Sequence, residues 1–221
     1  MAVTCLRCAH PDSAGRNFCS ECDAPLPLTG EEDYFSILGL ARVLGPDPGR
    51  LKAAYFELSR RLHPDVHVSD SPEVQDATLR RSALLNDAYQ VLRDPVRRVR
   101  YLLSLEGRGN AEGRTTTTAA NFELMETIQD AKLHEDPAVR ELKLREAEAQ
   151  VIVLKETALR FLDDLGRRWD ALARPDEPPA PRESLLDEML NRLDEIAYAE
   201  RLLREVEESR TPEASEKGNR K

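Results

Sequence analysis

The sequence predicts an all-α protein with a small cysteine-rich segment at its N-terminus. Charged residues make up 33% of the 221-residue chain and aromatic residues only 5%, a balance typical of solvent-exposed helices with narrow apolar seams. Apolar residues recur at steps of three and four over long stretches, which is the spacing of one helix face. All four cysteines lie within the first 22 residues. We therefore expect two small helical domains after a short N-terminal appendage.

The net charge of −9 is unevenly placed and favours protein partners. Residues 1–108 carry a net charge of −1 and residues 109–221 a net charge of −8. Such a chain is repelled by phosphate backbones, so we expect no nucleic-acid partner. No apolar run approaches the roughly 20 residues needed to span a bilayer, and the first cysteine comes too early for a signal peptide. We expect a cytoplasmic protein with no membrane partner.

The four cysteines form two C-x2-C pairs separated by ten residues. They are Cys5, Cys8, Cys19 and Cys22. This spacing lets two tight turns bring four thiolates to one tetrahedral ion, and reducing cytosol disfavours disulfides. We predict a zinc ribbon or knuckle over residues 1–29, in which zinc is structural because four protein ligands leave no open position for catalysis. An iron centre, a disulfide pair and a redox role are the alternatives.

The next segment predicts a helical hairpin. A short helix over 33–40 is N-capped by an acidic residue and ends at Gly39. A second helix over 50–62 carries an apolar face, while its opposite face is basic and gives it a local charge of +3. The apolar residues are Leu51, Tyr55, Leu58 and Leu62, and the basic ones are Arg50, Lys52, Arg60 and Arg61. A charge run of this kind is most often only a solvated face.

The tripeptide His63-Pro64-Asp65 ends the basic helix. Pro64 cannot continue a helix and excludes His63 from the α region, so the chain turns there and presents the Asp65 carboxylate beside the basic face. A further helix is expected over 72–92, with inward residues Ala77, Leu84 or Leu85, Ala88 and Leu92. The unit is thus a hairpin of two helices with a displayed loop.

This segment resembles the J-domain, and in particular that of the HscB family. The resemblance rests on YFSILGL at 34–40, AAYFELSRRLHPD at 53–65, LNDAYQVLRDP at 85–95 and RRVRYLL at 97–103. It implies a J-domain over 30–107 that binds the ATPase domain of an HscA- or DnaK-type chaperone, of the heat-shock protein 70 class, and stimulates ATP hydrolysis. By position, the resemblance implies that His63, Pro64 and Asp65 contact the chaperone, with Arg60 and Arg61 as basic contacts.

The second half predicts a three-helix antiparallel bundle over 114–210, followed by a disordered tail over 211–221. A glycine-rich joint over 107–113 precedes it, and Thr115 to Thr118 offer helix caps. A short apolar helix comes first. A long helix over 137–173 follows, and a proline-rich linker over 175–181 leads to the last helix. The expected seam of the long helix is Val139, Leu142, Val151, Leu154, Ala158, Phe161, Leu165, Trp169 and Leu172. That of the last helix is Leu186, Leu190, Leu193, Ile196, Leu203 and Val206.

The short apolar helix contains FELME at 122–126, which is similar to a segment of the HscB family. For this segment the resemblance implies binding of an IscU-type iron–sulfur scaffold protein, through Leu124, Met125 and Ile128. These residues could equally be core, and periodicity alone does not decide between the two.

The first functional hypothesis is therefore that the protein is an adaptor and not an enzyme. It recruits a chaperone ATPase through its J-domain and delivers a scaffold for iron–sulfur cluster assembly. The alternative hypothesis is a J-domain co-chaperone for a different client, with the bundle as a general interaction module. A metal-dependent enzyme would need an open ligand position or a histidine and carboxylate cluster, and a zinc-ribbon nucleic-acid binder would need a basic chain.

Overall fold

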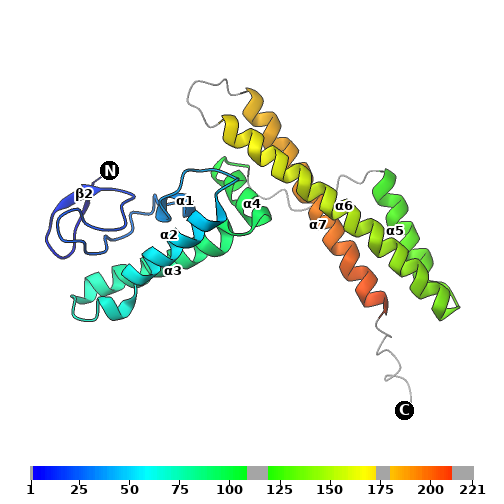
Figure 1. Cartoon of the computed structure of the whole chain (residues 1–221), viewed down its shortest axis with the longest axis horizontal. Coiled ribbons are helices and arrows are strands. Elements are labelled where there is room, and N and C mark those ends of the chain that lie inside the picture. The colour runs from blue at the N-terminus through cyan, green and yellow to red at the C-terminus, as the bar shows by residue number, and fades with distance from the viewer. Residues whose placement is uncertain (1, 109–118, 173–179, 211–221) are drawn as a thin grey trace, which may run out of the picture. The chain divides into compact units, whose positions relative to one another are not determined.

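A computed structural model describes residues 2–108, 119–172 and 180–210. Within these ranges the chain forms seven α-helices, one 3-10 helix and two three-residue strands, so the predicted all-α fold class is confirmed (Figure 1). The chain divides into two compact units. The first comprises residues 1–107 with 169–175, and the second comprises 108–168 with 176–221. No helix in the described ranges is both long and apolar enough to cross a membrane.

The first unit begins with a small antiparallel ribbon and continues as helices around α3. The elements are β1 (Ala2–Thr4), β2 (Pro11–Ser13), α1 (Tyr34–Ile37), α2 (Pro48–Arg61), η1 (Pro64–Val66), α3 (Pro72–Leu92) and α4 (Pro95–Leu105). In the ribbon Val3 lies opposite Asp12. Helix α3 contacts α1, α2 and α4, and is therefore the centre of this unit.

Aspartate caps define where three of these helices start. The Asp33 carboxylate accepts a hydrogen bond from the Ser36 amide, and the Ser36 hydroxyl accepts one from the Asp33 amide, which is a capping box. Asp47 and Asp94 each accept from the amide three residues on, and proline fills the first position of α2 and α4. The short helix is less extended than predicted and ends at Ile37, because Gly39 takes a left-handed conformation with φ of 65°.

The predicted apolar faces of the hairpin form its core. Its buried members from α1, α2 and α3, and from the residues that directly follow α1 and α2, are Phe35, Ile37, Leu38, Leu51, Leu62, Leu85, Ala88 and Leu92. Leu85 rather than Leu84 is the fully buried one of the predicted pair. The Tyr55 ring stacks on Tyr89 of α3 with a centroid distance of 4.2 Å, which joins the two long helices of the hairpin.

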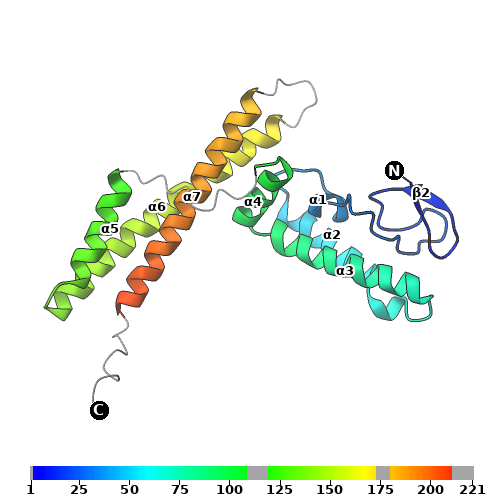
Figure 2. The same cartoon turned by 180° about the vertical axis from the view of Figure 1, so that it is seen from behind.

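The second unit contains α5 (Ala119–Lys132), α6 (Pro137–Leu172) up to Arg168, and α7 (Ala180–Arg210). Ion pairs join α6 to α7 along their length, as Arg168 with Glu188, Lys155 with Glu200, and Glu148 with Arg210. The partner numbers on α7 rise as those on α6 fall, so the two helices are antiparallel (Figure 2). The shared core of the three helices includes Ile128, Val151 and Ala199.

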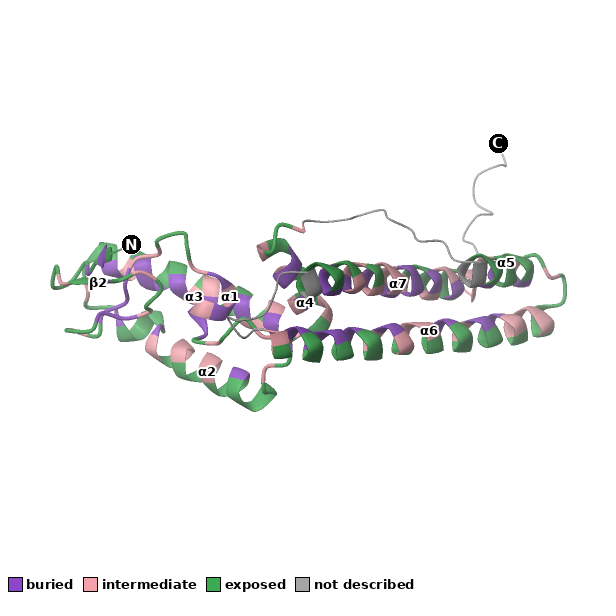
Figure 3. Ribbon diagram, turned by 90° about the horizontal axis from the view of Figure 1, so that it is seen from above, coloured by how far each residue is buried: buried purple, intermediate pink, exposed green. Residues whose placement is uncertain are grey.

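The seam of α6 differs from the predicted one at two residues. Buried residues follow one side of α6 and exposed residues the other (Figure 3). Leu142 and Phe161 are exposed, while Leu144, Ala147 and Leu162 are buried in their place. From Leu144 to Trp169 the buried apolar residues, together with the partly buried Leu154, recur at steps of three and four, and the two exposed residues are not part of that series. The Phe161 ring instead lies on the surface with the Arg192 guanidinium of α7 5.2 Å from its centroid.

Several predicted features fall outside the described residues. These are most of the glycine-rich joint, the cap candidates Thr115 to Thr118, most of the proline-rich linker, and the tail over 211–221. The predicted division between residues 29 and 30 lies inside the first compact unit, in which the cysteine segment and the hairpin pack together.

Candidate functional site

The loop between α2 and α3 displays the tripeptide at 63–65. His63 is extended (φ −68°, ψ 132°), Pro64 starts η1, and the His63 Nδ1 atom accepts a hydrogen bond from the Asp65 amide at 3.2 Å. The Asp65 side chain is 89% exposed and its carboxylate lies 3.6 Å from His63 Nδ1. Val66 and Val68, which sequence reasoning did not single out, are exposed beside it. The loop therefore offers a carboxylate, an imidazole and two apolar side chains to a partner.

The two predicted basic contacts at the end of α2 have different surroundings. Arg60 is exposed, like Arg50 and Lys52. Arg61 instead donates to the Asp23 carboxylate at 2.5 Å, and its guanidinium lies 3.7 Å from the centroid of the Phe18 ring. The cysteine segment thus engages Arg61, and Arg60 remains on the solvent-exposed face beside the loop.

A buried histidine fixes the far side of the loop. The His67 Nε2 atom donates to the Arg61 carbonyl oxygen at 2.8 Å, and its Nδ1 atom lies 2.9 Å from the Asp70 carboxylate. Asp70 also receives a hydrogen bond from the Arg7 guanidinium at 2.5 Å. The hydrogen bond with His67 and the nearby Arg7 charge hold the pKa of Asp70 below its usual range. This network connects both ends of the loop to the cysteine segment.

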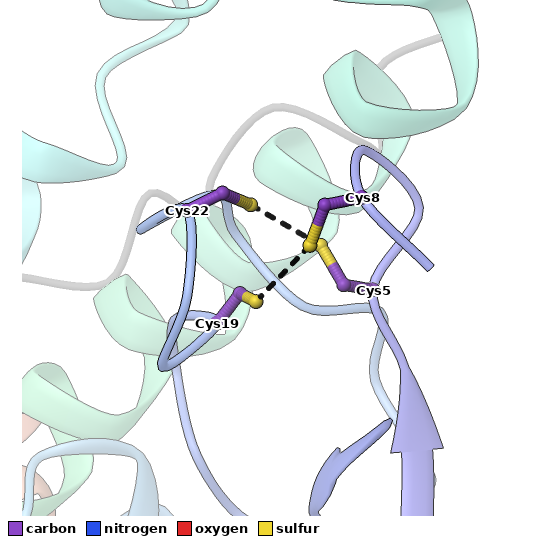
Figure 4. A group of neighbouring side chains, drawn as sticks. All are labelled: Cys5, Cys8, Cys19 and Cys22. Carbon is purple, nitrogen blue, oxygen red and sulfur yellow. Dashed lines mark hydrogen bonds between the residues drawn. The ribbon is translucent and has the colours of Figure 1, made fainter. Parts of the chain in front are cut away.

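The four cysteines converge on one point (Figure 4). All four sulfur atoms lie within 4.8 Å of one another, with Cys5 and Cys22 3.5 Å apart and Cys8 and Cys19 3.6 Å apart. A tetrahedron with metal–sulfur bonds of about 2.3 Å has edges of about 3.8 Å, so this cluster fits one four-coordinate metal ion. The four predicted ligands are thus positioned to bind one metal ion.

The two C-x2-C pairs are built as matching turns. In each, the residue after the second cysteine has a left-handed backbone, at Ala9 with φ of 59° and at Asp23 with φ of 57°. The amides of Ala9 and Asp23 donate to the carbonyl oxygens of Cys5 and Cys19, respectively. This repeated turn aims both sulfur atoms of a pair toward the same point.

Burial and amide donors act differently on the thiols. At Cys5 burial opposes ionisation, but the amides of Cys8 and Arg7 and the Cys22 thiol outweigh it and lower the pKa to about 7. At Cys19 burial dominates and raises the pKa to about 12. The four cysteines would hold a metal ion as thiolates, so its binding would release protons.

A fully buried arginine joins the cysteine segment to α3, and sequence reasoning missed it. The Arg81 side chain is 0% exposed and pairs with Glu32, which is 1% exposed, at 3.3 Å. Its other donors reach the carbonyl oxygens of Leu26 and Pro27 and the side chain of Asn17. The chain between the second cysteine pair and α1 therefore wraps around one guanidinium.

The structure buries two of the three predicted scaffold contacts on α5. Leu124 and Ile128 lie in the bundle core, whereas Met125 is partly exposed against its edge. Phe122 is exposed on the same side of the helix, and Leu133 just after the helix is 82% exposed. The apolar surface of this helix therefore consists of Phe122, Met125 and Leu133.

Two polar residues of α5 point toward α7 instead of outward. The Lys132 ammonium and the Gln129 amide both donate to the Glu205 carboxylate at 2.6 Å. These contacts hold the end of α5 against α7, and they border the exposed apolar surface of the helix.

Comparison with known protein families finds a match that covers the hairpin. The DnaJ domain matches residues 33–101. This range contains α1, α2, α3, the displayed loop and the first part of α4.

Curated relatives extend the similarity beyond that domain. The chain is 33% identical over 154 residues to the iron-sulfur cluster co-chaperone protein HscB of Mus musculus, with 68% of this chain and 65% of the mouse protein covered. It is 30% identical over 164 residues to the co-chaperone protein HscB homolog of Aliivibrio salmonicida, with 63% of this chain and 96% of that protein covered. The chain thus spans just under two thirds of the length of the mouse relative and nearly all of the bacterial one.

Solved structures agree in fold. Human co-chaperone protein HscB matches with a TM-score of 0.67 and 25% identity, over 92% of this chain and 96% of that one. Chaperone HscB from Vibrio cholerae matches with a TM-score of 0.54 and 24% identity, over 80% and 96% of the two chains.

Proposed function

The chain belongs to the HscB family of co-chaperones, a non-enzymatic class, and from that membership we propose that it stimulates the ATPase of an HscA- or DnaK-type chaperone and delivers an IscU-type iron–sulfur scaffold to it. The observation that carries the first part is the exposed tripeptide His63-Pro64-Asp65 at the end of a basic helix. The basic residues attract the partner over a distance, and the rigid loop discriminates between partners at contact.

The experiment that tests this function measures the steady-state ATPase rate of an HscA-type chaperone. We expect this chain to raise the rate by itself, and this chain together with an IscU-type scaffold to raise it more than either does alone. The electrostatic part of the encounter should weaken with added salt. A general unfolded client that replaces the scaffold equally well would instead favour a co-chaperone with a different client, and no stimulation under any condition would refute the J-domain function.

We also propose that the metal at the four cysteines is zinc and that it is structural. Four thiolates in a closed tetrahedral set suit zinc and leave no position for a reacting group. The surrounding segment has a small core of Val3, Cys5, Cys19, Ala24 and Leu26. Such a core is too small to order the segment unaided.

We expect one zinc ion per chain by elemental analysis of the purified protein, and loss of that ion on replacement of Cys19 and Cys22 with serine. Removal of the metal should abolish the ordered structure of residues 2–25, seen as loss of dispersed amide resonances there, while the bundle resonances stay unchanged. Because bound thiolates must be deprotonated, retention of zinc against a chelator should rise with pH. Full retention of those resonances without metal would contradict a structural role.

We propose that the scaffold binds the exposed apolar surface of α5, formed by Phe122, Met125 and Leu133. Large apolar side chains left exposed along one helix are typical of a protein-binding surface. Leu124 and Ile128 support this surface from below, since they pack in the core next to it.

Replacing Phe122 and Met125 together with serine is expected to weaken scaffold binding about tenfold or more, as truncation of apolar anchors does. The thermal unfolding midpoint should change little, because both residues are at least partly exposed. Leu142→Ser is the matched control, since Leu142 is an exposed apolar residue of α6. Isothermal titration calorimetry measures the affinity, and an equal loss in the control would contradict the proposed surface.

A further inference from the structure

We propose that the metal-binding segment holds the His-Pro-Asp loop in its working conformation, through contacts that both cysteine pairs make to the two ends of that loop. Arg7, Asp23 and Asp70 are then positioning residues. This inference rests on the proposed co-chaperone function, and it assigns the segment a role in that function.

The first cysteine pair holds the C-terminal end of the loop. Arg7 lies between Cys5 and Cys8, and its Nη2 atom is 2.5 Å from the Asp70 carboxylate. Its Nη1 atom donates to the Cys22 carbonyl oxygen at 3.3 Å. One guanidinium therefore connects both cysteine pairs to Asp70, and its direction is fixed by the turn that the metal closes.

The second cysteine pair holds the N-terminal end. Asp23 follows Cys22 and accepts from the Arg61 guanidinium at 2.5 Å. Phe18 precedes Cys19, and the same guanidinium stacks on its ring at 3.7 Å. Arg61 is the last residue of α2, two positions before His63. The loop is thus bracketed by Arg61 and Asp70, each of which contacts a neighbour of a metal ligand.

The buried His67 transmits these contacts to the interior of the loop. It bridges the Asp70 carboxylate and the Arg61 carbonyl oxygen, so the two ends are tied to each other as well as to the cysteine segment. Three backbone hydrogen bonds shape the loop, two of them to the tripeptide: the amides of Val66, His67 and Asp70 donate to the carbonyl oxygens of His63, Pro64 and His67, respectively, at 3.0 Å.

The physical consequence is that the order of the loop depends on metal occupancy. Without the metal, the small cysteine-rich core no longer fixes Arg7 and Asp23, and both ends of the loop lose their partners together. A loop that is already ordered binds a partner at a lower entropic cost than one that must order on binding. Metal loss should therefore weaken the chaperone contact without changing any residue that touches the chaperone.

Hydrogen exchange of the purified, metal-loaded full chain tests this directly. We expect exchange at the amides of Val66, His67 and Asp70 to rise about fivefold or more when the metal is removed, which is typical of a local opening that loses its supporting contacts. Arg7→Met combined with Asp23→Ala should produce the same rise while the metal stays bound. Arg80→Met is the matched control, because Arg80 forms an exposed pair with Asp76 within α3.

Two outcomes would overturn the inference. One is unchanged exchange at the three amides after metal removal. The other is that metal removal raises the exchange rate at these amides as much in the double variant as in the wild-type chain. Arg7 and Asp23 would then not be the contacts through which the metal-binding segment orders the loop. Should the double variant lose metal, Asp70→Asn tests the same network from outside the metal-binding segment and must raise exchange at Val66 and His67.

The chaperone ATPase assay tests this inference separately from the proposed co-chaperone function on which it rests. The double variant should need about three- to tenfold more protein for half-maximal ATPase stimulation, with the maximal rate retained, as expected for a weakened contact. If the wild-type chain does not stimulate the ATPase, the proposed function is refuted. The hydrogen-exchange result would then still decide whether the metal-binding segment orders the loop. Wild-type stimulation that is unchanged in the variant would overturn the inference alone.

Discussion

Asp65→Asn is expected to abolish stimulation of the chaperone ATPase, lowering it at least tenfold toward the basal rate, as removal of a central charged contact does. The Asp65 carboxylate projects from a short 3-10 helix into solvent, and no part of the core depends on its charge. The amide of residue 65 still donates to the His63 ring in the variant, so the turn itself is preserved. The loss is therefore one of contact chemistry.

The measurement compares ATPase stimulation with fold in the same preparation. Circular dichroism and the unfolding midpoint should match the wild-type protein, since exposed substitutions commonly change stability by only about 0.5 kcal/mol or less. Asp76→Asn is the matched control, because Asp76 is an exposed aspartate on the neighbouring helix. Stimulation by Asp65→Asn equal to that by the control would refute the role of the loop.

The elements that sequence predicts well are those defined by local chemistry. Helices α2, α3, α4 and α6 begin at a proline, and the predicted bounds of α3 match the observed ones. The cysteine cluster and the displayed tripeptide are equally local, because a fixed spacing or a single proline determines each. Such signals need no knowledge of the distant chain.

The features that sequence missed depend on residues far apart in the chain. Arg81 appears in sequence as one of many helical arginines, and only the fold reveals the carbonyl oxygens around it, 54 and 55 positions away. Arg61 is similar, since its partner Asp23 lies 38 positions away. On α5 the apolar residues were identified, but which of them face α6 and α7 depends on packing that periodicity does not specify.

Arg81→Met is expected to destabilise the first unit by about 3–5 kcal/mol, the usual cost of removing one partner of a buried ion pair. The substitution leaves the Glu32 carboxylate buried beside the carbonyl oxygens of Leu26 and Pro27, which also lose their donor. The cysteine segment and α3 should therefore separate more readily. Hydrogen exchange resolved along α3 and residues 17–37, together with urea unfolding, measures this. The neighbouring Arg80→Met should cost less than about 1 kcal/mol, as exposed pairs do.

The pH dependence of the unfolding free energy distinguishes loss of a counter-charge from simple loss of packing. In the wild-type chain burial opposes ionisation of Glu32, but the Thr29 amide and the Arg81 charge outweigh it and lower its pKa. Its ionised form thus stabilises the fold at neutral pH, and this contribution is lost as pH falls through the lowered pKa. In Arg81→Met the carboxylate keeps its hydrogen bonds from the Thr29 and Gly30 amides but loses its counter-charge, so its ionised form stabilises the fold less than in the wild-type chain. The stability gap between the two proteins should therefore narrow as pH falls from 7 toward about 4, and Glu32→Gln in the Arg81→Met background should recover part of the loss at pH 7. A gap that is independent of pH, with no recovery from Glu32→Gln, would show that the arginine acts through its packing alone.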